Sequence, residues 1–360
     1  MPNVVTAAVH GIGTAVPDHE VHRAFIAWAT PRIADDRTRR LFARMAARSG
    51  IERRWSVLPH GDDGGSPVDR GGFYDSDPLP GTAARMAAYA RHAPPLALAA
   101  IADLATRVDL GEVTHLVVAS CTGFVAPGID QIVARELGLA ATVERTFIGF
   151  MGCYAGITAL RTARHIVRSE PSARVLVVAV ELSSLHLSEA GTIEPLLAML
   201  QFSDGAAAAL VTAADAAPAD AMRLGEPASL ALDGGERLIE WRIGDAGFAM
   251  ELSGEVPGAL QLALDDAGVR ATLLGDGAPA LYAIHPGGRS VLDAVARGLD
   301  LDAHALDDSR AVLAANGNMS SATILFVLAR MIAQGRRGSG IALAFGPGVA
   351  IEGLRFELPG

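Results

Sequence analysis

Three residues of this sequence could cooperate in acyl transfer: Cys153, His285 and Asn318, each beside a predicted strand-to-helix turn. Cys153 directly precedes a helical pattern that runs to Arg168. At such a position the unpaired N–H groups and the positive end of the helix dipole favour a thiolate. We therefore expect the pKa of Cys153 to lie below the value of about 8.5 for a free cysteine, which makes it a nucleophile at neutral pH.

The other two residues supply groups that polarise a carbonyl. His285 follows the short apolar run Leu281–Ile284 and precedes Pro-Gly-Gly, and Asn318 lies in Gly-Asn-Met-Ser-Ser at the start of another helical pattern. Taken singly, each of the three residues has a common structural explanation: a small buried thiol, a hydrogen-bonded core histidine, or an asparagine that caps a helix. Together, a thiol, an imidazole and an amide are what covalent thioester chemistry requires.

The elements that must position these groups follow an α/β pattern, in which short apolar runs alternate with longer stretches of helical period. The apolar runs predict strands buried on both faces, so we expect a layered α/β core. An Ala/Pro/Asp-rich linker at 213–221 divides the chain into halves at 1–213 and 222–360. The predicted strands are His115–Ala119, Arg174–Val180, Ala206–Thr212, Leu281–Ile284 and Ile341–Phe345, and the predicted helices are Glu20–Arg48, Thr82–Arg107, Gly128–Leu137, Tyr154–Arg168, Gly288–Leu299 and Ser320–Gln334.

Composition excludes several classes of function. The 360 residues are 50% hydrophobic and carry a formal net charge of −10, which argues against a surface for nucleic acid or anionic membranes. All 30 basic residues are arginine, so a Walker-A loop and a Schiff-base lysine are both absent. No apolar run is long enough to span a membrane and no secretory signal is present, so we expect a cytoplasmic protein. Two cysteines and no metal-ligand spacing predict neither a disulfide framework nor a metal site.

Four motifs give these residues a family context. MGCYAG around Cys153, IHPGG around His285, GNMSS around Asn318 and the segment AFGPG at 344–348 resemble the active-site motifs of type III polyketide synthases, the chalcone-synthase-like family. The resemblance covers nearly the whole chain in family order. It implies a thiolase-like fold, a five-layered αβαβα arrangement of two related halves, and a homodimer that uses acyl-CoA and malonyl-CoA without a cofactor.

The resemblance also implies roles for individual residues. Cys153 carries the acyl group, His285 pairs with its thiolate and polarises the thioester, and Asn318 is the second oxyanion donor. Phe202 and Phe248 correspond to paired gatekeepers between the CoA tunnel and the cavity. The CoA-binding residues are Arg44, Arg48, Gly287 and Gly288, with Leu41 where many members have a third basic residue, and the pocket-lining residues are Cys121, Ala126, Ser320, Phe345 and Gly346.

Two departures bear on the substrate. Ala126 stands where plant members carry a methionine that reaches into the partner's cavity, and the wording CTGFVAPG resembles bacterial members that make alkylpyrones or alkylresorcinols from fatty acyl starters. Cys121, in contrast, resembles malonyl-primed members such as tetrahydroxynaphthalene synthases. We therefore expect an iterative synthase with a fatty acyl starter and a pyrone or resorcinol product. The alternatives are a malonyl-primed aromatic synthase, a ketoacyl-ACP synthase III-like condensing enzyme, and a non-catalytic acyl-CoA-binding relative.

Overall fold

The computed structural model describes residues 5–59, 61, 65–188, 193–275 and 277–360. Within these residues the strands are β1 (Ala7–Ala15), β2 (His19–Glu20), β3 (Trp55–Ser56), β4 (His115–Ser120), β5 (Glu144–Gly149), β6 (Val175–Leu182), β7 (Asp204–Ala213), β8 (Met222–Ala231), β9 (Ile239–Gly244), β10 (Gly247–Leu252), β11 (Leu281–Ile284), β12 (Gly338–Gly346) and β13 (Ala350–Leu358). The α-helices are α1 (His22–Ala29), α2 (Asp36–Ala47), α3 (Thr82–Ala105), α4 (Ile129–Glu136), α5 (Ala155–Ser169), α6 (Ile193–Met199), α7 (Val256–Asp265), α8 (Ala267–Leu274), α9 (Arg289–Gly298), α10 (Asp307–Asn316) and α11 (Thr323–Ala333).

The main sheet runs through both halves of the chain. Its strand order is β11-β12-β13-β8-β1-β7-β6-β4-β5, and β1 pairs with both β7 and β8. The linker predicted at 213–221 therefore runs between the two partners of β1, and most of it lies outside the strands, with a short 3-10 turn at Ala214–Ala216. The division into halves at 1–213 and 222–360 stays a prediction.

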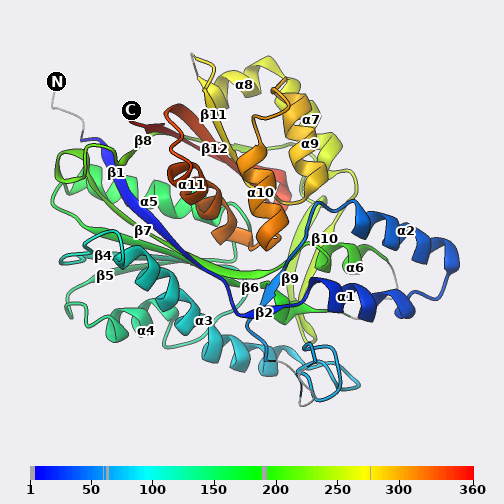
Figure 1. Ribbon diagram of the computed structural model, residues 1–360. Helices are drawn as coiled ribbons and strands as arrows, with labels where there is room; N and C mark the ends of the chain where they lie inside the picture. Colours follow the sequence, from blue (N-terminus) through cyan, green and yellow to red (C-terminus); the bar gives the residue numbers. More distant parts are fainter. Residues whose placement is uncertain (1–4, 60, 62–64, 189–192, 276) are drawn as a thin grey trace.

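Helices lie in three layers around this sheet (Figure 1). Helix α3 covers β1, β6 and β7 from one side, and α5 and α11 lie on the opposite side of the same strands. Helices α7, α9 and α10 cover the strands of the second half, β11 to β13, from outside. Helices α5 and α11 also contact β13 and β11, so the two ends of one nine-stranded sheet provide both sheet layers of the αβαβα arrangement that the resemblance implies.

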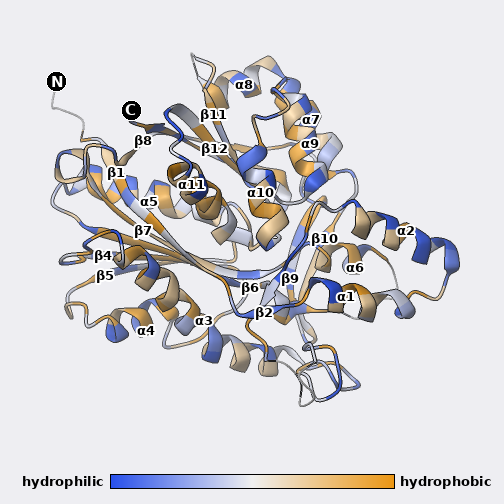
Figure 2. Cartoon of the chain, in the orientation of Figure 1, coloured by the Kyte–Doolittle hydropathy of each residue, from blue (hydrophilic) through white to orange (hydrophobic). Residues whose placement is uncertain are grey.

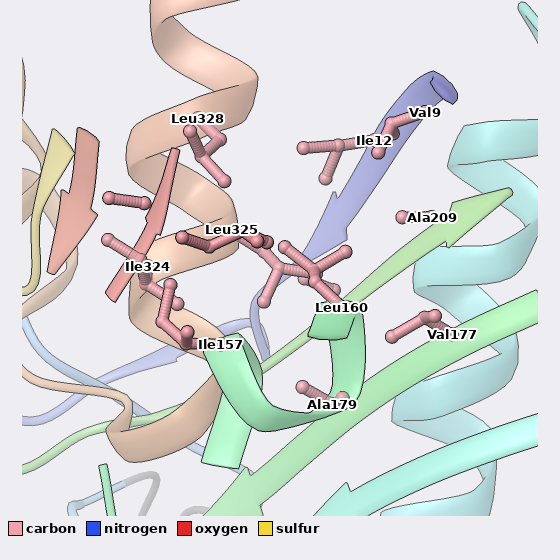
Figure 3. Close-up of a cluster of buried hydrophobic side chains, with 14 of the residues drawn as sticks. Val9, Ile12, Ile157, Leu160, Val177, Ala179, Ala209, Ile324, Leu325 and Leu328 are labelled. Atoms are coloured by element: carbon pink, nitrogen blue, oxygen red, sulfur yellow. The ribbon is translucent and has the colours of Figure 1, made fainter. Parts of the chain in front are cut away.

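Apolar burial explains why these layers form. β4, β6 and β7 are buried along their whole length, as strands covered on both faces must be. Figure 3 shows the core between the layers, where Ile157 and Leu160 of α5 meet Leu325 of α11 above Val177 of β6. Helix α5 turns this apolar side inward, and in Figure 2 the strands and inner helix faces are the most hydrophobic parts of the chain. The rigid core fixes the helix that follows Cys153.

The predicted strands and most helices lie close to the observed ones, but the continuous helix predicted over Glu20–Arg48 is wrong. The structure has two α-helices there, α1 and α2, separated by the 3-10 turn Thr30–Arg32. Pro31 lacks a backbone donor and ends α1, and the Asp35 carboxylate accepts a hydrogen bond from Thr38 N at 2.6 Å and starts α2 anew. No helix among the described residues is long and apolar enough to cross a membrane.

Candidate active site

The structure brings Cys153, His285 and Asn318 together on the wall of one cavity of about 470 Å³. Cys153 lies just before α5, His285 just after β11, and Asn318 between α10 and α11, so both halves contribute. The volume falls within the usual range of small-molecule sites. Convergence of the three residues, the central prediction from the sequence, is therefore observed as geometry, while their catalytic roles remain a proposal.

Close packing holds Cys153 in place. Gly152, which precedes it, has φ +86°, and a Cβ there would lie 2.3 Å from Pro347 Cδ. On the first turn of α5, a Cβ at Gly156 would lie 2.2 Å from the carbonyl oxygen of Ser321. Only glycine permits this backbone conformation and this approach. Gly156 therefore allows the start of α5 to pack against the segment that carries Asn318, and Gly152 allows the residue before Cys153 to approach Pro347.

The pKa of Cys153 differs from the expectation. Burial raises it to about 11, although hydrogen bonding from Ser320 and Asn318 acts in the opposite direction. The nearby Glu181 carboxylate raises it further. Loss of solvation, which raises the pKa of the thiol, thus outweighs the effect of the helix N-terminus, which lowers it. The sequence pattern shows only the second of these two effects. At neutral pH the side chain of Cys153 is therefore a neutral thiol in this site.

His285 is a buried neutral base. It is 1% exposed, and its backbone N–H donates to the carbonyl of Leu343 at 2.8 Å, which fixes it at the end of β11. Neither Nδ1 nor Nε2 has a hydrogen-bond partner in the described part of the chain. Burial lowers the pKa of His285 to about 3. The imidazole therefore has both nitrogens free for a substrate or for the proton of Cys153, and no hydrogen bond joins it to the thiol in the described structure.

Asn318 is held by its backbone and by both ends of its amide. Its N–H donates to the carbonyl of Gln201 at 2.8 Å, and its own carbonyl accepts from Ser203 N at 2.9 Å. Nδ2 donates to the carbonyl of Gly287 at 3.3 Å, and Oδ1 accepts from Ser320 N at 2.9 Å. These two hydrogen bonds show which end of the amide carries the NH₂ group. One of its two N–H groups donates to Gly287, so the other is available to donate to an oxyanion.

The two predicted gate residues, Phe202 and Phe248, lie in different surroundings, and their role as a gate stays a prediction. Phe202 lines the cavity that also holds Cys153, His285 and Asn318. Phe248 is 3% exposed and stacks on His186, with ring centroids 4.3 Å apart, and it does not line the cavity. Met250, two residues further along β10 and so on the same strand face, is the residue that does. A flexible thioether stands where the sequence analysis placed a second phenyl ring.

Four of the five predicted pocket-lining residues face this cavity, and their roles with a substrate stay a prediction. Cys121, Ser320, Phe345 and Gly346 line the cavity. Ala126 lies on the surface of this chain, outside the cavity, so its expected role depends on a partner subunit. Trp241 was not predicted from the sequence: its indole Nε1 donates to the carbonyl of Cys121 at 2.9 Å, and its ring forms part of the cavity wall.

A buried carboxyl group next to the site was also missed. Glu181 is 0% exposed and accepts hydrogen bonds from Cys121 N at 3.0 Å, from Thr122 Oγ1 at 2.8 Å and from Ser321 Oγ. Burial raises its pKa to about 7, despite these three donors. The signal in the sequence was a single acid inside the apolar run Val175–Leu182. This group ties the loop of Cys121 to the segment that follows Asn318.

The predicted CoA-binding residues cluster at the mouth of the cavity. Arg44 and Arg48 line a depression of about 560 Å³ that shares Leu41, Met45, Leu197, Gln201 and Ser290 with the catalytic cavity. Gly287 lines the cavity itself. Gly288 is the N-cap of α9, and a Cβ there would lie 2.0 Å from Gln201 Oε1. A molecule whose phosphate groups bind the arginines can thus place its other end in the cavity, near Cys153.

The chemistry available here is acyl transfer with a neutral thiol, a neutral imidazole and an amide donor. No cluster of three or more His, Cys, Asp or Glu side chains suited to a metal ion occurs among the described residues.

Comparisons with known proteins agree with this site. Residues 78–215 match the N-terminal domain of chalcone and stilbene synthases, and residues 227–358 match their C-terminal domain. The chain is 32% identical to an alpha-pyrone synthesis polyketide synthase-like protein of Mycobacterium tuberculosis, over 99% of this chain and 92% of the relative. It is also 32% identical to bisdemethoxycurcumin synthase of Oryza sativa, over 87% of this chain and 82% of the relative.

Solved structures show the same fold. The polyketide synthase PKS-I of the brown alga Ectocarpus siliculosus superposes with a TM-score of 0.89 at 27% identity and covers 99% of both chains. The type III polyketide synthase domain of Steely1 from Dictyostelium gives a TM-score of 0.84 at 25% identity, covering 98% of this chain and 99% of that one. The thiolase-like fold predicted from the motifs is thereby confirmed. The chain belongs to the chalcone and stilbene synthase family and is a type III polyketide synthase, an acyltransferase.

Proposed function

We propose that this synthase loads a fatty acyl group from acyl-CoA onto Cys153, extends it with malonyl-CoA in repeated decarboxylative condensations, and releases a pyrone- or resorcinol-type product. The observation that supports this most directly is the meeting of Cys153, His285 and Asn318 on one cavity wall. The proposal also takes the enzyme to act as a homodimer, in which Ala126 of each subunit faces the cavity of its partner.

Loading begins with a proton transfer. His285, kept neutral by burial, takes the proton of Cys153 as the sulfur attacks the thioester carbonyl of the acyl-CoA. The carbonyl oxygen becomes an oxyanion that accepts hydrogen bonds from the free N–H of Asn318 and from His285. When the intermediate collapses, the C–S bond to CoA breaks and the CoA sulfur receives the proton from His285. The acyl group remains on Cys153 as a thioester.

Extension uses the same two donors. Malonyl-CoA loses CO₂, and the electron pair of the broken C–C bond becomes an enolate whose oxygen is stabilised by Asn318 and His285. An apolar wall beside the malonyl carboxylate disfavours its charged form, so Phe202 and Met250 favour its loss as neutral CO₂. The enolate carbon then attacks the acyl carbonyl on Cys153, forming a C–C bond and expelling the sulfur. The lengthened chain is now a thioester of CoA, and a second transfer like the loading step forms its C–S bond to Cys153, breaks the C–S bond to CoA and releases CoA for the next cycle.

The wall of the cavity supports an apolar starter. Aliphatic and aromatic side chains make up most of it, from Ile193, Leu197, Ile239, Leu252, Val256 and Leu260 to Trp241 and Phe345. Burial of apolar surface in such a site contributes roughly 0.8 kcal/mol for each buried CH₂ group. An alkyl chain is therefore bound more tightly here than a charged malonyl starter. The alpha-pyrone relative supports the same product class.

The test supplies the purified protein with malonyl-CoA and a series of acyl-CoAs of increasing chain length, and follows CoA release and products by mass spectrometry. We expect an acyl adduct on Cys153, pyrones or resorcinols from long-chain starters, and no adduct in Cys153→Ala. Cys121→Ala is the matched control, which should still be acylated. No CoA release with any starter would refute the proposal, and products from malonyl-CoA alone, or only from acyl carrier protein, would replace it by the corresponding alternative.

A further inference from the structure

We propose that Arg289, the first residue of α9, binds a CoA phosphate at the mouth of the cavity together with Arg44 and Arg48. The proposal rests on the proposed function, because it assumes that CoA thioesters enter through this mouth. Leu41 of α2 stands where the family resemblance leads one to expect a third basic residue. In this protein the third positive charge at the depression comes from α9, as Arg289.

The three arginines line one depression although two helices supply them. Arg44 and Arg48 come from the C-terminal end of α2, and Arg289 from the start of α9. Ser290, next to Arg289, lines both this depression and the catalytic cavity. A molecule held by Arg289 is therefore at the opening that leads to His285 and Cys153, and not on a separate surface.

Contacts within the protein position the side chain of Arg289 but leave N–H groups of its guanidinium available to a ligand. Nη1 donates to the carbonyl of Arg48 at 3.3 Å, and Nε lies 3.6 Å from Asp293 Oδ2. Nη2 has no partner among the described residues, and the side chain is 54% exposed. The contact with the Arg48 carbonyl ties the start of α9 to the C-terminal end of α2, and both side chains line the same depression. Because a guanidinium has five N–H donors in a plane, Arg289 can still present a pair of them to phosphate oxygens.

The surrounding charges favour an anion. Asp293 is the only acid that lines the depression in the described structure, and its Oδ1 is already paired with Arg310 Nη2 at 2.7 Å. The ten-residue helix α9 also begins here, after Gly288, and its unpaired N–H groups add partial positive charge. Cations from two helices and a helix terminus thus face one opening, which suits the diphosphate and ribose phosphate of CoA.

The experiment compares the wild-type protein with Arg289→Gln, Arg289→Lys and the control Arg297→Gln. Arg297 is exposed on the same helix, donates to Gln261 Oε1 at 2.9 Å and does not line the depression. Affinity for CoA itself is measured by isothermal titration calorimetry, so the result does not depend on turnover. In parallel, kcat and KM are measured with malonyl-CoA and with the N-acetylcysteamine thioester of malonate, which carries no phosphate.

Loss of one charge-assisted phosphate contact should weaken CoA binding by roughly five- to twentyfold in Arg289→Gln. Arg289→Lys should recover part of the affinity, since it keeps the charge but not the planar pair of donors. The KM for malonyl-CoA should rise in step, with kcat nearly constant and a far smaller effect on the N-acetylcysteamine thioester. Arg297→Gln should bind CoA like the wild type.

Two results would overturn the assignment: equal CoA affinity in wild type and Arg289→Gln, or an equal loss with the thioester that has no phosphates, which would mean a general structural effect. Failure of the proposed function looks different, because the wild-type protein would then bind CoA and turn over neither thioester.

Discussion

Replacement of Glu181 by glutamine is expected to change how the stability of this protein depends on pH. The carboxyl group is completely buried between Cys121, Thr122 and Ser321. Its pKa is raised from 4.5 to about 7, chiefly by loss of solvation. Glutamine has almost the same shape and keeps an acceptor oxygen, but it does not titrate.

The sign follows from proton binding in the two states. Between pH 4.5 and about 7, folded Glu181 keeps its proton while the unfolded side chain has released it. The folded state binds more protons in this window, so this group's contribution to the free energy of unfolding falls as the pH rises. The difference between the two pKa values corresponds to about 3 kcal/mol, which is lost once the pH exceeds the folded pKa.

Urea denaturation of the wild type and Glu181→Gln at about pH 5 and about pH 8 measures this contribution. Between these two pH values the free energy of unfolding of the variant should rise by about 2.5 kcal/mol relative to that of the wild type. Glu112→Gln, which changes an exposed side chain, serves as the control. Its free energy of unfolding should equal that of the wild type at both pH values. Should Glu181→Gln also run parallel to the wild type, burial of an acid with a raised pKa would be the wrong description.

A second readout concerns the nucleophile. The Glu181 carboxylate raises the pKa of Cys153, so its replacement by glutamine should lower that pKa. Alkylation of Cys153 by iodoacetamide, followed by mass spectrometry across a pH series, should then reach half its maximal rate at a lower pH in Glu181→Gln. An unchanged alkylation profile would show that the two groups do not interact.

Other predictions follow from the same contacts. Asn318→Ala should slow decarboxylation of malonyl-CoA by roughly 10²- to 10³-fold, measured as CO₂ release, because it removes one oxyanion donor. Gly156→Ala should lower the free energy of unfolding by roughly 2 to 4 kcal/mol in urea, since its Cβ would lie 2.2 Å from the Ser321 carbonyl, whereas Gly258→Ala on exposed α7 meets open space and should stabilise slightly. Trp241→Ala should enlarge the cavity and lengthen the polyketides seen by mass spectrometry, and an unchanged product pattern would count against Trp241 as a wall of the reaction chamber.

The residues at strand-to-helix turns were the part of the site most accessible to sequence reasoning. Cys153 and His285 each stand at a point where the hydrophobic period changes from strand to helix, whereas Asn318 lies between α10 and α11 and not at the strand-to-helix turn predicted for it. The motifs marked all three residues, and the resemblance of these motifs to one family indicated that the residues converge. The same reasoning placed Arg44 and Arg48 on one helix face.

The cavity residues that lie in the middle of a strand were harder to predict from the sequence. Phe248 and Met250 lie on the same face of β10, and the sequence pattern does not tell which of them reaches the cavity and which packs on His186. Trp241 comes from β9, which pairs with β10 in a small separate sheet that the analysis did not predict. The depth of burial, which sets the pKa of Cys153, is a property of the assembled layers and is not contained in the local motif.

These pKa values describe a site that holds almost no charge before the substrate arrives. Burial keeps Cys153 protonated and His285 neutral, and it keeps Glu181 largely protonated below about pH 7. Three neutral groups are far less costly to bury than an ion pair, so the cavity can be lined by apolar side chains and still contain a nucleophile and a base. In the proposed mechanism, charge develops only when the thiol gives its proton to His285 during attack, at the moment when Asn318 and the imidazole stabilise the oxyanion. The apolar wall that suits an alkyl starter and the delayed ionisation of the nucleophile are thus two consequences of the same burial.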